Sequence, residues 1–87
     1  MQSKVYFSQN ITADEIVKMY EKLGITLPGN VAVKVHSGEA GNQNFLGPDL
    51  YKEVINKVNG TVVECNTAYA GKRNTTEEHL QTMKDHG

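Results

Sequence analysis

Two polar segments of the sequence hold the residue types that bind ligands or exchange protons. The first begins at His36 and contains Glu39, Asn42 and several glycines. The second begins at Glu64 and contains Arg73. An imidazole, carboxylates and a guanidinium that converge can bind an anion or move a proton on a bound molecule. The glycine spacing matches neither GxxxxGK[ST] nor GxGxxG. The same residues are also compatible with a polar connection that binds nothing.

The second segment adds a helix start to these residues. Lys72 and Arg73 stand just before Thr75 and Glu78, a pair that predicts a capping box. Cations beside a helix N-terminus favour a site for a phosphate or a carboxylate. The alternative is two cations that are simply solvated.

Two charged residues interrupt apolar strand sequences. Lys34 lies in residues 31–36, on the same expected face as His36, and Glu64 lies in residues 61–65. Because burying an unpaired lysine is costly, Glu64 is the expected partner of Lys34. The pair would be a structural ion pair or part of a site with coupled titration. Otherwise Lys34 extends its amine to solvent at the sheet edge.

Cys65, followed by Asn66, ends the last expected strand. A thiol paired with His36 would suit nucleophilic or redox chemistry. A lone cysteine in a strand is also typical of a small core residue. His36, His79 and His86 lack the spacing of a metal site, so we expect no metal bound by this chain alone.

The elements that position these loops alternate regularly along the chain. Thr12 with Glu15 predicts a helix start, Gly24 a helix end, and Pro48 the first turn of a second helix. The last helix offers only Leu80 and Met83 as clear apolar anchors. The expected elements are strands at residues 4–8, 31–36 and 61–65, and helices at residues 13–23, 48–58 and 76–86.

Strands separated by helices imply a parallel sheet. The fold class expected is therefore α/β, a three-layer βαβαβα unit with a short parallel sheet, as in an incomplete Rossmann-like domain. The strand at residues 31–36 is a near-continuous apolar run, as in a strand covered on both faces. Ligands bind at the carboxyl ends of such strands, where both polar segments lie. Three strands are few for such a sheet, so residues 1–87 are either a single small domain or the N-terminal fragment of a larger one.

Composition narrows the class of protein without assigning a reaction. The chain has 87 residues, a net charge of −1 and one cysteine. These values give no attraction to nucleic acid and exclude an intrachain disulfide or a cysteine-ligated cluster made by this chain alone. No secretory signal and no membrane-spanning run is recognised, so a cytoplasmic location is expected.

Two long segments resemble one bacterial and archaeal family. Residues 31–42, VAVKVHSGEAGN, are similar to its segment VAVKxHxGExGN. Residues 60–87 are similar to its segment GTxxECNTxYxGxRxxTxxHLxxxxxHG. This is the family catalogued as domain of unknown function 362, an uncharacterised group associated with iron–sulfur proteins, and the resemblance runs from Lys4 onwards.

The resemblance implies a place for the site and a larger protein around it. Family members are several times longer, and many carry a ferredoxin-type segment with clustered cysteines, so any iron–sulfur cluster would be bound by protein beyond this chain. The shared motifs supply ligand-binding candidates without assigned roles, namely Lys34, His36, Glu39, Asn42, Glu64, Cys65, Asn66 and Arg73.

Two functional hypotheses follow from these observations. In the first, the chain is part of a ligand-binding or catalytic domain, with a small-molecule or anion site at the strand ends that further protein completes. In the second, it is a non-enzymatic assembly module whose open sheet edge pairs with another copy or with the rest of a parent protein.

Overall fold

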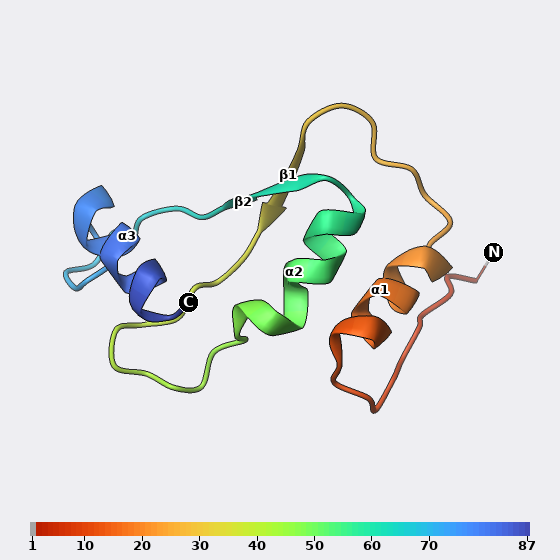
Figure 1. Ribbon diagram of the computed structural model, residues 1–87, viewed down its shortest axis with the longest axis horizontal. Coiled ribbons are helices and arrows are strands. Elements are labelled where there is room, and N and C mark those ends of the chain that lie inside the picture. The colour runs from red at the N-terminus through yellow and green to blue at the C-terminus, as the bar shows by residue number, and fades with distance from the viewer. Residues whose placement is uncertain (1) are drawn as a thin grey trace.

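The computed structural model describes residues 2–87 and shows a small mixed α/β arrangement of three helices and two strands (Figure 1). In chain order the elements are α1 (Ala13–Lys22), β1 (Val31–Lys34), α2 (Pro48–Lys57), β2 (Gly60–Val63) and α3 (Thr76–Asp85). The three predicted helices and the last two predicted strands are therefore present, and both strands are shorter than predicted.

The two strands pair in parallel, as predicted for strands joined by a helix. Val31 lies opposite Gly60 and Lys34 opposite Val63. One further bond, from the amide of Val35 to the carbonyl of Val63 at 3.2 Å, extends the ladder beyond β1. The carboxyl ends of both strands therefore lie side by side, which brings the two polar segments of the sequence together.

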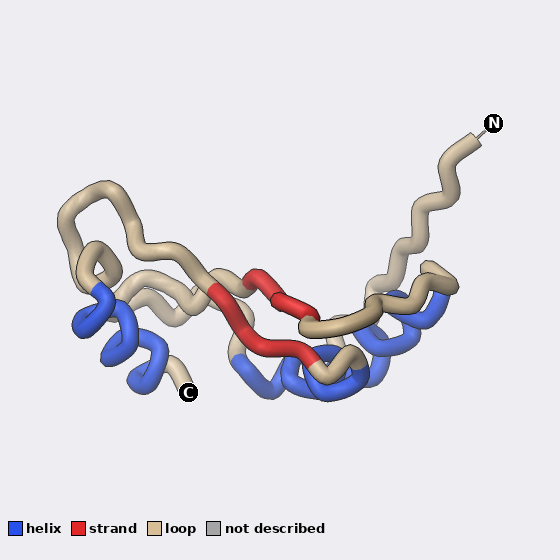
Figure 2. The backbone as a smooth tube through the Cα atoms, turned by 90° about the horizontal axis from the view of Figure 1, so that it is seen from above, coloured by secondary structure: helices blue, strands red, loops and turns tan. Residues whose placement is uncertain are grey.

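Only one face of this sheet is covered by helices. Val31 and Val33 are half-buried, whereas Ala32 and Lys34 are exposed. The α2 helix packs on the sheet and α1 packs on α2, so the helices gather on one side of the strands (Figure 2). The prediction of a strand covered on both faces in a three-layer unit is thus wrong for residues 2–87, because no helix among them reaches the second face.

The helix termini are those that the sequence predicts. Thr12 and Thr75 act as N-caps, since their side-chain oxygens accept the amides of Glu15 and Glu78 at 3.2 and 3.3 Å. Gly24 follows α1 with φ +63°, the left-handed conformation that ends many helices. Local capping chemistry therefore fixes where α1 and α3 begin.

The predicted strand at residues 4–8 is not formed. Residues 2–10 are extended, with no ladder partner among residues 2–87, and this segment lies beside α1, away from the sheet (Figure 1). Val5 is 88% exposed and Phe7 83% exposed. A strand requires a hydrogen-bonding neighbour, and neither β1 nor β2 lies beside this segment.

The apolar core is very small. Ile55 on α2 is the one hydrophobic residue that is buried among those described, at 8% exposure. The radius of gyration is 15.1 Å, against about 12 Å for a compact domain of this length. Much of the order in the molecule must therefore come from polar contacts, which concentrate at the strand ends.

Candidate functional site

Arg73 is the centre of the polar cluster at the strand ends. Its side chain is 5% exposed and lies between two carboxylates. Nη1 donates to Glu39 Oε1 and Nη2 donates to Glu64 Oε1, both at 2.5 Å. The guanidinium thus joins the segment after β1 to the segment after β2. Its Nε is buried without a hydrogen-bond partner among residues 2–87.

Glu64 receives hydrogen bonds on both carboxylate oxygens. Oε1 accepts from Arg73, and Oε2 accepts the amide of Ser37 at 3.1 Å and lies 3.1 Å from His79 Nε2. Burial alone would raise the pKa of this carboxyl, but the hydrogen bonds from Ser37, Arg73 and His79 together lower the pKa of Glu64 to about 2. Glu64 is therefore ionised, with a side chain only 1% exposed.

His79 extends the cluster to the start of α3. Its Nδ1 lies 2.9 Å from Asn66 Oδ1, and the amide nitrogen of Asn66 donates to Thr76 Oγ1 at 3.2 Å. Both ring nitrogens of His79 therefore lie beside acceptor oxygens, Nδ1 beside Asn66 and Nε2 beside Glu64. Arg73 is the cation that lies between Glu39 and Glu64.

A serine, a histidine and an asparagine lie in a row here, but their geometry does not activate the serine. Ser37 Oγ is 3.4 Å from His79 Nε2, while Glu64 Oε2 is closer to the same nitrogen at 3.1 Å. A nucleophile and its base lie about 2.6–3.2 Å apart. Ser37 is also buried, at 7% exposure. The row therefore acts as internal support.

Glu39 and Tyr69 form the solvent-facing rim of the cluster. The Tyr69 hydroxyl donates to Glu39 Oε1 at 2.5 Å. This hydrogen bond, reinforced by Arg73 and opposed by partial burial, lowers the pKa of Glu39. The same bond, reinforced by partial burial and opposed by Arg73, raises the pKa of Tyr69. Because Glu39 is 40% exposed, a ligand in solvent can reach it.

His36 is exposed beside the rim and is held by one backbone bond. Its Nδ1 accepts the amide of Gly38 at 3.0 Å, so a neutral ring carries its proton on Nε2. That nitrogen lies 3.4 Å from Arg73 Nη1, which is also a donor. Two donors therefore face each other with no acceptor between them.

The loop after β1 is shaped by a tight contact. Gly38 has φ +92°, and a Cβ at this position would lie 2.7 Å from Cγ of Phe45. The Phe45 ring stacks on His86 with centroids 4.0 Å apart, and His86 Nδ1 lies 2.6 Å from the carbonyl oxygen of Ser37. Only glycine allows this approach, which ties the loop to the end of α3.

The structure brings together five of the eight candidate residues that the sequence provided. His36, Glu39, Glu64, Asn66 and Arg73 belong to the cluster or its rim. The other three candidates lie outside it, namely Lys34, Asn42 and Cys65.

The expected pair of Lys34 with Glu64 is wrong. Glu64 is paired with Arg73 and His79, and the amine of Lys34 is exposed and donates to the Val35 carbonyl at 3.4 Å. The two residues fall on opposite faces because Lys34 pairs with Val63, and side chains alternate along a strand. Of the alternatives, extension of Lys34 to solvent is the one observed.

Cys65 and Asn42 are also removed from the cluster. Cys65 is an exposed free thiol with no hydrogen bond to His36 among the described contacts, and its exposure also contradicts a place in the core. Asn42 Oδ1 accepts the amide of Asn44 at 2.8 Å, a local turn in the exposed loop. Neither is among the hydrogen-bond partners of the Arg73 side chain within residues 2–87.

An anion site at the start of α3 is not supported by the geometry. Arg73 is occupied by two carboxylates, and Lys72 pairs with Glu78 at 3.2 Å. Thr75 already caps the helix, and the acidic residues Glu77 and Glu78 stand in its first turn. Both features disfavour a further negative charge at that terminus.

Sequence reasoning missed the roles of Ser37, His79 and His86. The sequence feature that could have indicated these roles is the small number of apolar residues in α3. Leu80, an expected anchor, is 51% exposed, whereas His79 and Thr82 are buried. A helix with few apolar residues, packed beside loops that carry Glu39 and Glu64, buries a polar face when carboxylates are present to satisfy it.

Comparisons of the chain with protein-family models, with curated proteins and with solved structures find no match. Among residues 2–87, no group of three or more His, Cys, Asp and Glu side chains is placed to hold a metal ion. None of the described helices has the length and apolar character needed to traverse a bilayer.

Proposed function

We propose that the chain is the α/β portion of an iron–sulfur-associated cytoplasmic protein, an incomplete Rossmann-like domain with a small-anion site at the carboxyl ends of β1 and β2. The resemblance of residues 31–42 and 60–87 to domain of unknown function 362 supports the association. The chain's own residues do not fit a cysteine-ligated cluster, since Cys65 is its single cysteine. In this proposal any cluster is bound by other protein.

The observation that carries the anion site is the pair of donors at His36 and Arg73. Nε2 of His36 and Nη1 of Arg73 lie 3.4 Å apart, and the second N–H of Nη1 is not used by Glu39. One carboxylate or phosphate oxygen between them accepts from both and removes the unfavourable contact. His36 is exposed, so the site opens to solvent. In this proposal Glu39 and Glu64 are positioning residues that hold Arg73.

Thermal unfolding with inorganic phosphate and with acetate tests this site. We expect phosphate or acetate to raise the Tm of the wild-type chain by several degrees and to leave that of His36→Asn unchanged. Asparagine retains an acceptor for the Gly38 amide, so the loop keeps its support while the Nε2 donor is lost. Lys52→Ala, which removes an exposed cation from α2, is the matched control and should respond as wild type. An equal response in His36→Asn, or none in wild type, would refute the site.

A second candidate function is assembly, and the exposed surface of the chain favours it. A folded monomer of 9.6 kDa exposes about 5,100 Å², whereas this chain exposes 6873 Å². The excess of about 1,800 Å² per chain, doubled for two chains, falls within the roughly 2,000–5,000 Å² that obligate dimers bury. We propose that the chain associates through its open sheet. Sedimentation as a 9.6 kDa monomer at all concentrations would contradict assembly.

A further inference from the structure

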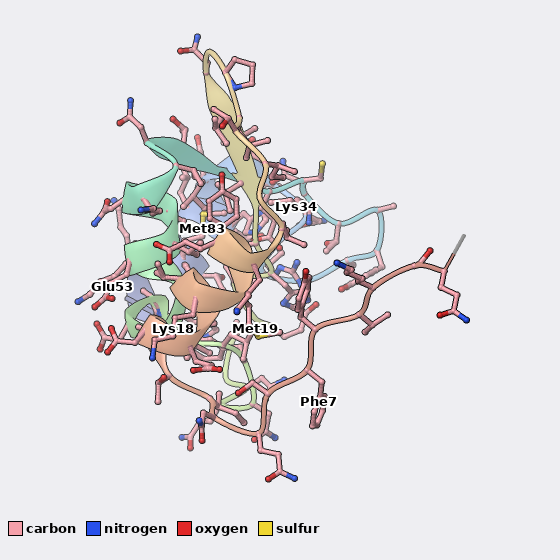
Figure 3. The ribbon with its side chains drawn as sticks, turned by 90° about the vertical axis from the view of Figure 1, so that its right-hand side faces the viewer. Phe7, Lys18, Met19, Lys34, Glu53 and Met83 are labelled. Atoms are coloured by element: carbon pink, nitrogen blue, oxygen red, sulfur yellow. The ribbon has the colours of Figure 1, made fainter. Side chains whose placement is uncertain are left out.

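The N-terminal arm, residues 4–8, has the sequence of a strand but pairs with no strand among residues 2–87. Its Lys4-Val5-Tyr6-Phe7-Ser8 sequence is rich in β-branched and aromatic residues. Tyr6 packs toward α1, in a hollow that includes Met19 and Tyr20. Val5 also lines this hollow but is 88% exposed, and Phe7, which does not line it, is 83% exposed. Figure 3 shows Phe7 projecting into solvent, away from the helices.

The free edge of β1 borders an apolar groove. This edge groove has a volume of about 410 Å³ and is lined by residues 33–36, residues 44–46 and Tyr51. Val33 and Lys34 of β1 line it together with the two residues that follow the strand, whereas a face of the sheet would present only alternate residues. No residue of β2 lines it, so the groove lies along the side of β1 where a further strand would add.

The alternation of the arm matches the alternation of the sheet. Val31 and Val33 form the half-buried, helix-covered face of β1, and Ala32 and Lys34 form its exposed face. An added strand with Val5 and Phe7 on the covered side places both in the edge groove, against Phe45 and Tyr51. Lys4, Tyr6 and Ser8 then join the mixed polar face that solvent already reaches.

We propose that residues 4–8 of one copy add as a strand beside β1 of a second copy, and reciprocally, so that each arm fills the partner's edge groove. This inference rests on the proposed assembly function and names its occupant. Mutual exchange of identical segments closes a two-fold dimer and covers the unpaired edge of β1. It buries Val5 and Phe7, the two most exposed large hydrophobic residues among residues 2–87. Their burial accounts for part of the excess exposed area of about 1,800 Å² per chain, which is of the size that a dimer buries.

Sedimentation equilibrium of point variants tests the arm. We expect Phe7→Ser to raise the dimer dissociation constant at least tenfold, because each Phe7 leaves an apolar groove. Since Phe7 projects away from α1, the monomer's own packing is unaffected. Ile11→Ser, at a residue that is 79% exposed but outside the arm, is the matched control and should leave the constant unchanged. A dimer that Phe7→Ser does not weaken overturns the arm exchange and leaves assembly standing, whereas a monomeric wild type overturns both.

Disulfide trapping separates exchange from insertion into the same chain. In a Cys65→Ser background, one chain carries Phe7→Cys and a second, tagged chain carries Leu46→Cys. Oxidation of the mixture is expected to give the tagged heterodimer. If instead the double variant Phe7→Cys/Leu46→Cys closes only an intrachain disulfide in a monomer, the arm pairs with its own β1 and the proposal is refuted.

Discussion

The two ends of the chain are ordered by opposite means. At the C-terminal end, α3 and the segments after β1 and β2 are joined by a buried network around Arg73, with Glu64 1% exposed. At the N-terminal end, residues 4–8 are extended, apolar and largely exposed, with Phe7 at 83%. Polar contacts therefore stabilise one end without a large apolar core, while Val5 and Phe7 at the other end are left largely uncovered by residues 2–87.

This contrast determines where each region's stability must come from. All members of the buried ion-pair network belong to one chain. Its loss should therefore lower the free energy of unfolding of each chain, whether or not the chain is associated. An exposed apolar arm gains free energy only when another surface removes it from water. Changes at the cluster should therefore alter the unfolding of each chain, and changes at the arm should alter association.

Replacing the central arginine should give the largest effect. Arg73→Met keeps the length of the side chain but leaves Glu39 and Glu64 facing each other without a cation. Removing one partner of a buried pair costs about 3–5 kcal/mol. In a chain with so small a core, we expect loss of helical circular dichroism or a large fall in the urea midpoint.

The control for this variant is an ion pair that is not buried. Lys52→Ala removes the exposed pair with Asp49 on α2 and should change the free energy of unfolding by less than about 1 kcal/mol. Equal stability of Arg73→Met and Lys52→Ala at one protein concentration would show that the cluster does not order the C-terminal end.

Acid should weaken the same network through Glu64. Its pKa is about 2 in the folded chain, against 4.5 for a glutamate without these partners. A depressed carboxyl pKa stabilises the fold above pH 4.5, and that stabilisation, about 3 kcal/mol, is lost as the pH falls from 4.5 toward 2. Glu39, whose pKa is also lowered, acts in the same direction.

Urea unfolding at pH 6 and at pH 3 measures this dependence. The wild-type chain should lose stability between the two, and Glu64→Gln should lose less because its amide does not titrate. Glu53→Gln, on the exposed part of α2, should follow wild type. Identical pH dependence in Glu64→Gln and wild type would place the acid sensitivity outside the cluster.

The two ends also differ in how far the sequence predicts them. Capping boxes at Thr12 and Thr75 and the βαβ order are local or pattern signals, and they predict α1, α3 and the parallel pair correctly. The strand at residues 4–8 is mispredicted because propensity describes the segment, whereas pairing needs a neighbour. The partner of Glu64 is mispredicted for two reasons. Lys34 lies on the opposite face of the sheet from Glu64, and Arg73 reaches Glu64 through the conformation of the loop after β2, which the spacing of residues in the sequence does not predict.

The contact between the loop after β1 and the end of α3 should contribute an intermediate amount to the free energy of unfolding. His86→Ala removes the stacking on Phe45 and the hydrogen bond to the Ser37 carbonyl, for a loss of about 1–2 kcal/mol. His86→Phe keeps the stacking and should recover part of the loss in thermal unfolding. Full recovery of stability would show that the hydrogen bond contributes nothing. An unchanged stability in His86→Ala would show that these contacts do not hold α3 against that loop.

The smallest effects compare the two ends directly through matched caps. Thr12→Ala removes the side-chain acceptor of the Glu15 amide, and Thr75→Ala removes that of the Glu78 amide. Each substitution should destabilise its helix by about 1 kcal/mol. The α3 helix is tied to the cluster through His79, so the loss at Thr75 should appear in full in global urea unfolding. The α1 helix holds the arm and has no buried residue of its own, so the loss at Thr12 should appear first as faster amide exchange within α1. If both variants lower the global urea midpoint equally and leave amide exchange in α1 unchanged, the two ends unfold as one unit. The N-terminal and C-terminal ends would then differ in how they are ordered but not in how stable they are.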